Sequence, residues 1–518
     1  MTNTDAVSRA GRRLQVIPLL LLAVFFVAPV ASMVIRFARV DTLVDTVTDP
    51  SLRGVWWFTL WQATASTAAT LLFGVPLTWA VSRFSFVGSR WVTALVTVPF
   101  FMPAVVIASG TKAVIPSQPM LGILWAHVVF NVAVVVRVVG PRWSLMDPAM
   151  EHTAADLGAR PLRVFTTVVF PWVSGALRNA TAIVFVFCFT SYGVIAILGG
   201  ISRRTVESEV FIQAVRLGDT RTAVSLSLVQ AAVVLLVFVV GTRDGTGHRP
   251  DHVHTARVHD VGVTRRTVTR HNRRAVATAT LVPTALVVTP LTALVVRSLL
   301  IDGSPSLDGY RWLLDGAAKS VGIDMLHVFG TTVLFALTCS ILTVVSATII
   351  SFARNPTRAV VTLTAMPLVV SAVTLGLGII VTFDTSPIDW RGATWLIPVI
   401  HSVIALPLAV RTIDGAVGAV PDSIRMAAAS LGAGPWRTWW RIELPLVRPA
   451  LARAAGLSAA VSIGEFGATS FLSRNNSTTL PIAISQLMGH PGTVLPQVAF
   501  ALAAVCVVVF TLVFAATV

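Results

Sequence analysis

The sequence predicts an all-α integral membrane protein with about 12 transmembrane helices, arranged as two parallel six-helix repeats. Three observations predict this fold: the composition, the lengths of the apolar runs and an internal repeat. Of the 518 residues, 55% are hydrophobic and only 12% are charged, whereas about a quarter of the residues in a soluble domain are charged. A water-soluble core cannot bury so much apolar surface, so we expect lipid to be the solvent.

The apolar runs are long enough to cross a membrane, because about 20 helical residues span the roughly 30 Å of hydrocarbon. The first run is longer than a signal-peptide core and lacks a small-residue cleavage site, so we expect it to be retained as a helix. In the first half the runs lie near residues 14–36, 58–82, 92–115, 119–138, 176–199 and 221–241. In the second half they lie near residues 276–301, 327–352, 358–382, 393–411, 449–470 and 493–516.

The net charge of +16 is distributed asymmetrically along the chain. Arginines gather in alternate loops, around residues 83–90, 137–163 and 243–274, which fall on one side if the helices simply alternate. This is the positive-inside pattern, so the charge indicates orientation in a membrane and not nucleic-acid binding. We expect a multi-pass protein of the cell membrane, with both termini cytoplasmic and the lipid bilayer, not nucleic acid, as its partner.

An internal repeat organises the chain. Two long stretches align without a gap at a constant offset of 274 positions, which places His127 on His401 and Gly193 on Gly467. Chance does not hold one offset over so long a stretch, so the protein contains a duplicated unit. An even number of helices in each unit makes the two copies parallel, related by an axis along the membrane normal. A pathway would then follow the seam between the two halves.

The repeat divides the chain into a first half at residues 1–241, a cytoplasmic linker at 242–275 and a second half at 276–518. The linker is rich in Arg, Asp, Gly and Thr and contains five histidines. Their spacing matches no known ligand pattern, so we favour a solvated tether over a metal sensor. The three cysteines lie singly inside apolar runs, and they predict neither a disulfide nor a metal site.

The most similar parts of the two copies are cytoplasmic loops at residues 139–175 and 412–448. Each loop predicts a short helix of small residues, a break at a glycine, a second helix opened by a proline, and then aromatic and basic side chains. Small residues let another protein approach closely, and exposed aromatic rings can act as anchors. The candidate contact residues are Ala154, Ala155, Gly158, Pro161, Arg163 and Phe165 in the first loop and Ala428, Ala429, Gly432, Pro435, Arg437 and Trp439 in the second.

At these residues the sequence resembles the permeases of binding-protein-dependent ABC importers, whose loop has the pattern Glu-Ala-Ala followed by Gly three residues later. This resemblance implies a type I importer permease fold, in which each loop is a coupling helix that docks on an ATP-binding subunit. It also implies two copies of that subunit and an extracytoplasmic solute-binding protein as partners. The sequence departs from the pattern at the glutamate, which is replaced by His152 in the first copy, next to Glu151, and by Met426 in the second.

The chain has only two lysines, and neither follows the glycine spacing of a phosphate-binding loop. We therefore expect a transport subunit that is not an enzyme and binds no cofactor directly, with ATP used by the separate partner subunit. An ion-coupled secondary transporter would need several acidic residues within the membrane or inverted repeats, and the sequence has neither. A membrane enzyme would need paired carboxylates or metal ligands, and the acidic loop residues form no such set.

Two further stretches, residues 189–200 and 462–481, resemble the thiamine and ferric-iron branch of fused permeases. Thiamine is the cargo we expect, and ferric iron is the alternative. Residues 464–467 also resemble molybdate and sulfate permeases, so an oxyanion is a third alternative.

Four polar residues inside the predicted spans are candidates for the pathway. Glu465 is costly in lipid, so it is either a pathway or gate carboxylate attractive to a cationic cargo or a cap on a helix broken between Gly464 and Gly467. Both interpretations stay open from the sequence. The other candidates, His127, Asn131 and His401, could line the seam, although interhelical hydrogen bonding is the interpretation we favour for the histidines.

Overall fold

The structure, a computed structural model, describes residues 14–200, 203–242, 265–270, 272–352, 357–385, 388–390 and 392–515. Ten helices of this described part are long and apolar enough to cross a membrane, and two bent helix pairs bring the number to 12. The predicted all-α membrane fold is therefore confirmed. The histidines of the linker lie outside the described residues.

The chain forms its helices in the same order in both halves. In the first half these are α2 (Val16–Leu22), η1 (Ala23–Val27), α3 (Ala28–Phe37), α4 (Val40–Thr48), α5 (Pro50–Arg83), α6 (Ser89–Phe101), α7 (Ala104–Val114), α8 (Pro119–Ser144), α9 (Pro148–Asp156), α10 (Pro161–Val164), η2 (Phe165–Val169), α11 (Phe170–Phe189), α12 (Gly193–Leu198), α13 (Val206–Phe211), η3 (Ile212–Arg216) and α14 (Thr220–Thr242).

In the second half the helices are α16 (Arg273–Ser298), α17 (Asp308–Leu314), η5 (Ala317–Val321), α18 (Met325–Phe352), α19 (Arg358–Ala365), η6 (Met366–Leu368), α20 (Ala372–Thr382), α21 (Leu396–Gly418), α22 (Asp422–Ser430), α23 (Pro435–Thr438), η7 (Trp439–Glu443), α24 (Leu444–Gly464), α25 (Gly467–Leu472), η8 (Asn475–Ser477), α26 (Leu480–Gly489) and α27 (Val494–Ala515). The described strands are short pairs: β1 (Phe84–Ser85) with β2 (Arg266–Thr267), β3 (Leu300–Ile301) with β4 (Ser304–Pro305), and β5 (Asp384–Thr385) with β6 (Ile388–Asp389).

The repeat is visible in the positions at which helices begin and end. The bounds of α9 and α22, of α10 and α23, of η2 and η7, and of α12 and α25 each differ by 274 residues, the offset found in the sequence. All of these elements belong to the loop and the broken span that follow the fourth spanning helix of each half. The duplicated sequence therefore folds twice into the same local structure.

Four predicted spans are not single helices. The run at 92–115 is the pair α6 and α7, bent by 109°, and the run at 358–382 is the pair α19–η6 and α20, bent by 103°. Pro103 lies at the first bend and Pro367 just before the second, and a proline disfavours the helical conformation of the residue before it. The runs at 176–199 and 449–470 also break, because α11 ends at Phe189 and α24 ends at Gly464.

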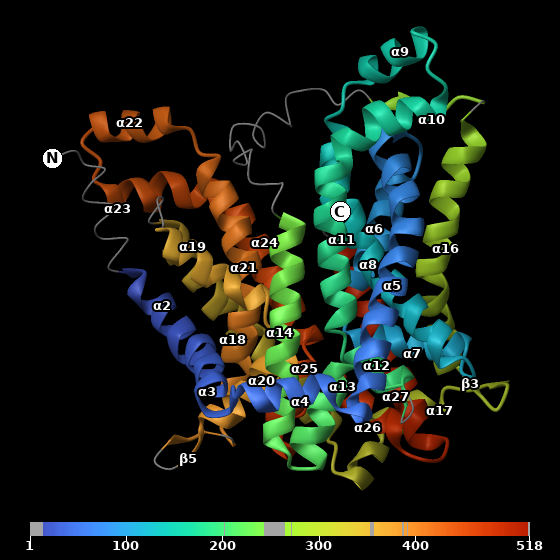
Figure 1. Ribbon diagram of the computed structural model, residues 1–518, viewed down its shortest axis with the longest axis vertical. Coiled ribbons are helices and arrows are strands. Elements are labelled where there is room, and N and C mark those ends of the chain that lie inside the picture. The colour runs from blue at the N-terminus through green and yellow to red at the C-terminus, as the bar shows by residue number, and fades with distance from the viewer. Residues whose placement is uncertain are drawn as a thin grey trace.

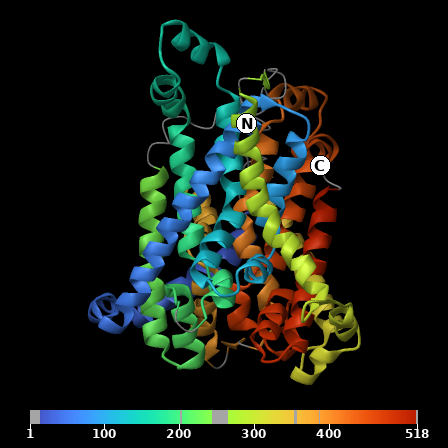
Figure 2. The ribbon, with the colours of Figure 1, turned by 90° about the vertical axis from the view of Figure 1, so that its right-hand side faces the viewer.

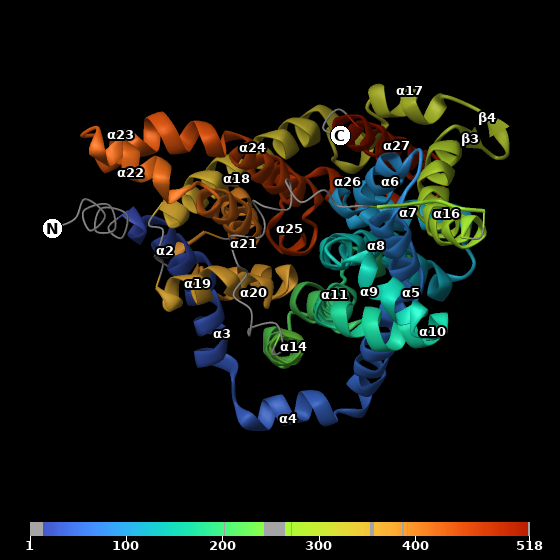
Figure 3. The ribbon, with the colours of Figure 1, turned by 90° about the horizontal axis from the view of Figure 1, so that it is seen from above.

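The first spanning helix of each half packs against the other half. Helix α16 contacts α5, α6 and α7, whereas α3 contacts α20 and α2 contacts α18. Figure 3 shows α16 beside α7 and α3 beside α20. A β-carbon on Gly110 would lie 2.5 Å from the Pro290 carbonyl oxygen, and one on Gly378 would lie 3.1 Å from the Pro29 side chain. The approach at Gly110 therefore requires glycine, and the approach at Gly378 leaves little room for a side chain.

The two ends of the molecule differ in structure. Helices α9 and α10 lie at one end together with α22 and α23, and the short helices α12, α13, α17 and α26 gather at the other (Figure 1). Figure 2 shows the spanning helices running between these two ends. The molecule thus presents a face of paired loops at one end and, at the other, a face where helices from both halves meet.

Candidate functional site

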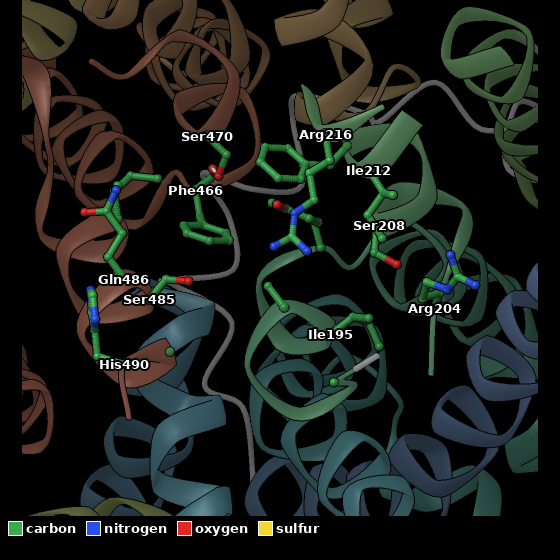
Figure 4. Close-up of a pocket in the computed structure, with 16 residues that line it drawn as sticks. Ile195, Arg204, Ser208, Ile212, Arg216, Phe466, Ser470, Ser485, Gln486 and His490 are labelled. Atoms are coloured by element: carbon green, nitrogen blue, oxygen red, sulfur yellow. Dashed lines mark hydrogen bonds between the residues drawn. The ribbon is translucent and has the colours of Figure 1, made fainter. Parts of the chain in front are cut away.

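A cavity of about 490 Å³ lies between the two halves, on the side away from α9 and α22. One wall comes from α12, α13 and η3 of the first half, and the other comes from α25 and α26 of the second (Figure 4). The volume falls in the range of about 300 to 1,000 Å³ that is usual for small-molecule sites. A second cavity of about 340 Å³ adjoins it and shares Ser470, Ile482, Gln486 and His490 in its lining.

The lining of the first cavity is built from repeat partners. Twelve of its 16 residues form six pairs separated by 274 positions. The pairs are Tyr192 and Phe466, Ala196 and Ser470, Ser208 and Ile482, Phe211 and Ser485, Ile212 and Gln486, and Arg216 and His490. Equivalent residues of two related units can face one another only around the axis that relates the units. The cavity therefore lies on the pseudo-two-fold axis, where the sequence predicts the pathway.

An aromatic pair lies at this axis. The rings of Tyr192 and Phe466 stack with centroids 5.2 Å apart and planes inclined by 19°. Phe211 packs against Tyr192 at 5.5 Å and reaches Phe471 edge-on at 5.4 Å, so the stack is held from one side. Because each ring comes from a broken span, the breaks after Phe189 and Gly464 serve to bring both rings to the axis.

The cavity has a basic lining. Arg204 and Arg216 line the first cavity and Arg474 lines the second, and no carboxylate lines either one within the described chain. Arg204 is paired with Glu209 at 3.0 Å. Arg216 has no hydrogen bond or ion pair to any described residue. Figure 4 shows the Arg216 side chain reaching into the cavity between Phe466 and Ser208.

Glu465 lies next to the cavity but does not line it. Its carboxylate accepts hydrogen bonds from the amides of Ala468 and Thr469, each at 2.9 Å, and so caps the start of α25. The Nε2 atom of His401 is hydrogen-bonded to the Thr469 hydroxyl at 2.9 Å. The same atom lies 3.4 Å from the Glu465 carboxylate. The contacts of Glu465 are thus those of the helix-capping interpretation.

His127 and Asn131 also lie away from both cavities, buried within the first half. His127 Nδ1 is 2.9 Å from the Ser66 hydroxyl on α5. The Asn131 amide donates to the His127 carbonyl oxygen at 3.0 Å. In the second half the matching ring nitrogen of His401 bonds the Ser462 hydroxyl at 2.8 Å. Both histidines therefore make the interhelical hydrogen bonds that we favoured from the sequence.

The two loops have the predicted local structure. Pro148 opens α9 after Asp147, whose side chain accepts from the Ala149 amide at 2.8 Å. Gly158 and Gly432 follow the first short helix of each loop with φ of +84° and +75°, a conformation that favours glycine. Beside them Leu157 and Leu431, themselves repeat partners, are 84% and 88% exposed. These leucines were not among the predicted contact residues.

Most of the predicted loop residues whose side chains are described are exposed, but Ala154 is half-buried and two residues of the second loop are buried. Trp439 is only 4% exposed because its ring packs against Phe352 with centroids 5.0 Å apart, so the expected exposed anchor at this position is wrong. Ala428 is buried as well. The exposed rings of the second loop are Trp436 and Trp440.

Glu151 ties the first loop to the rest of the protein. It pairs with Arg83 at the end of α5 and lies 3.1 Å from Arg266 in β2. Its repeat partner carries the opposite charge: Arg425 pairs with Asp422 at 2.8 Å and with Glu443 at 3.2 Å. The described end of the linker is therefore docked on the first loop, and it is not a free tether at this point.

Sequence reasoning missed the residues that line the axis. Tyr192 and Phe466 lie in the two stretches that resemble thiamine and ferric-iron permeases, but they were not singled out, and Arg216 carries no motif of its own. The repeat offset pairs each of the three with another cavity residue. Within the described residues no cluster of three or more His, Cys, Asp or Glu could hold a metal ion.

The chain is similar to membrane components of transport systems. Residues 351–518 match the family described as binding-protein-dependent transport system inner membrane component. The chain is 24% identical to the thiamine transport system permease protein ThiP of Brucella abortus over 464 residues, 83% of this chain and 81% of that protein. ThiP of Salmonella typhimurium is also 24% identical, over 462 residues and 83% of each chain. A putative 2-aminoethylphosphonate transport system permease protein, PhnV of Salmonella typhimurium, is 34% identical over 122 residues, 24% of this chain and 46% of that protein.

Proposed function

We propose that this chain is a fused two-half permease of the binding-protein-dependent kind, which imports a small solute delivered by an extracytoplasmic binding protein. Thiamine is the first candidate for that solute. The choice of thiamine rests on the similarity to thiamine permeases over 464 residues, which extends through both halves. The cavity on the axis between those halves supports the role of a pathway.

The loops at 139–175 and 412–448 are proposed to dock two copies of an ATP-binding subunit, which would hydrolyse ATP outside this chain. Their support is the exposed Leu157 and Leu431 beside the glycine turns, an apolar surface that a partner would cover. In this orientation the face of α9 and α22 is cytoplasmic. Helix α2 begins and α27 ends toward that face (Figure 1), which supports cytoplasmic termini.

A bare ferric ion gains no support from the cavity. The carboxylate that suggested a cationic cargo, Glu465, is engaged in capping α25, and the described lining contains arginines without an acid. Iron is therefore the weaker alternative.

The test is uptake of labelled thiamine by a strain that lacks its own transporter and expresses this chain with its ATP-binding and solute-binding partners. We expect saturable uptake that is lost when the ATP-binding subunit is omitted. Cells that take up no thiamine, although the chain reaches the membrane, would exclude thiamine as the cargo.

A further inference from the structure

We propose that the axial cavity binds a phosphate or phosphonate group on the cargo, with Arg216 as its principal ligand. The inference rests on the proposed importer function and names the chemical class that its pathway accepts. It concerns a site that neither the family match nor the named relatives assign.

The first step is the charge of the cavity. Arg204 is compensated by Glu209, whereas the positive charge of Arg216 is uncompensated among the described residues. Glu207, on α13 outside the spanning helices, does not line the cavity, and burial raises its pKa to about 8, which favours the uncharged form of the carboxyl. An uncompensated guanidinium in a partly enclosed cavity attracts an anionic group.

The second step is the set of donors around Arg216. The side chains of Ser485, Gln486 and His490 line the same cavity and make no side-chain hydrogen bond to a described residue. Figure 4 shows Gln486 and His490 across the cavity from Arg216. A guanidinium that can offer two parallel N–H bonds, with an amide and a hydroxyl nearby, is suited to a tetrahedral oxyanion. The stacked rings of Tyr192 and Phe466 form an apolar wall for the rest of the solute.

The third step is the difference between the halves. The repeat partner of Arg216 is His490, and that of Arg204 is Thr478. The second half folds the same way without arginine at these positions, so folding of the duplicated unit does not require it. The positive charge of Arg216 is therefore present in only one of two halves that fold alike, as we expect of a residue that selects the cargo.

The experiment measures uptake of three labelled cargoes by the complete complex in parallel: thiamine, thiamine monophosphate and 2-aminoethylphosphonate. We expect uptake of a cargo that carries phosphate or phosphonate. Comparing thiamine monophosphate with 2-aminoethylphosphonate distinguishes a phosphate ester from a phosphonate. Arg216→Gln should raise its KM by about tenfold or more with a Vmax within about twofold, because a hydrogen bond to a charged group is lost. Arg216→Lys, which keeps the charge, should stay within about threefold of the parent KM.

Arg221→Gln is the matched control, since Arg221 is an exposed arginine of the same half that lines neither cavity. It should leave KM unchanged. Uptake of a phosphate-bearing cargo that is indifferent to Arg216→Gln would overturn the proposal, and so would transport of thiamine alone. Transport of no cargo at all would count against the proposed function instead.

A binding measurement decides the site independently of transport. The purified chain in lipid nanodiscs should gain thermal stability with inorganic phosphate relative to chloride at equal ionic strength, because a ligand that binds only the folded state stabilises it. Arg216→Gln should abolish the gain and Arg221→Gln should keep it. A gain that survives Arg216→Gln, or no gain in the parent chain, would contradict the assignment.

Discussion

At the scale of single residues, Glu465 shows how a buried acid in a membrane protein can serve the backbone. Its carboxylate satisfies two amides at the start of α25 that have no partner within that helix. The neighbouring Phe466 then enters the axial stack. The acid therefore holds in place the turn that carries the ring.

We predict that Glu465→Ala destabilises the protein by about 1 kcal/mol, the typical cost of a lost helix cap. Glu465→Gln keeps an acceptor oxygen and should cost less. The measurement is thermal unfolding of the purified complex, combined with KM for the transported cargo, which should not change. A KM that rises in Glu465→Gln at unchanged stability would instead place the carboxylate on the pathway.

The glycine turns of the two loops support a second prediction at this scale. Nothing lies within 4 Å of a β-carbon built on Gly432, so a large side chain there would extend into the space a partner needs. Gly432→Trp should therefore reduce co-purification of the ATP-binding subunit and cargo uptake. Gly432→Asn is the control, because asparagine tolerates positive φ and separates backbone strain from bulk.

The same pair of substitutions at Gly158 should have the smaller effect, since the first loop offers Phe165 where the second exposes both Trp436 and Trp440. Normal complex formation and normal uptake in both tryptophan variants would show that the loops do not contact the ATP-binding subunit at these glycines.

At the scale of elements, the broken spans bring two aromatic rings together at the axis, and we predict that their stack closes the pathway. Tyr192→Ala and Phe466→Ala each remove one ring of a stack whose contact is worth about 0.5 to 1.5 kcal/mol beyond its buried area. We expect either variant to leak cargo across proteoliposomes without ATP. Phe185→Ala is the control, because Phe185 stacks on Phe189 at 5.6 Å within α11 and does not line the axial cavity. Tight vesicles in both variants would mean that the stack does not close the pathway.

The elements also show where sequence reasoning succeeds. Hydropathy predicts that a span exists, because a sufficiently long apolar helix has a lower free energy in lipid than in water. It cannot predict the 109° bend between α6 and α7, since both arms are apolar and the bend depends on what packs against them. The loops were predictable in detail because glycine and proline act locally.

The axial site was not predictable in this way. Arg216 and His490 acquire their common position only when α13–η3 and α26 meet across the seam. Trp439 was placed wrongly for a related reason. Its burial depends on Phe352, at the end of α18 and distant in the sequence.

At the scale of the whole molecule, the two halves are joined because the first spanning helix of each half packs against the other half. Gly110→Leu and Gly378→Leu would each insert a side chain where even a β-carbon is too close to the proline-bearing helix of the other half. Overfilling a packed contact costs about 1 to 3 kcal/mol. We expect both variants to lower the thermal midpoint and the yield of folded protein. Gly330→Leu on α18, with open space around it, should behave as the parent chain.

The same exchange constrains the order of events during synthesis. When α14 has been made, the groove at Gly110 is still uncovered, because α16 that fills it has not yet been translated. The delay is longer for α3, because its packing partner α20 is synthesised more than 300 residues later. Such distant contacts form late and leave intermediates exposed. A chain whose synthesis stopped in the linker would therefore have all six spanning helices of the first half, yet the surface at Gly110 that α16 covers would stay exposed.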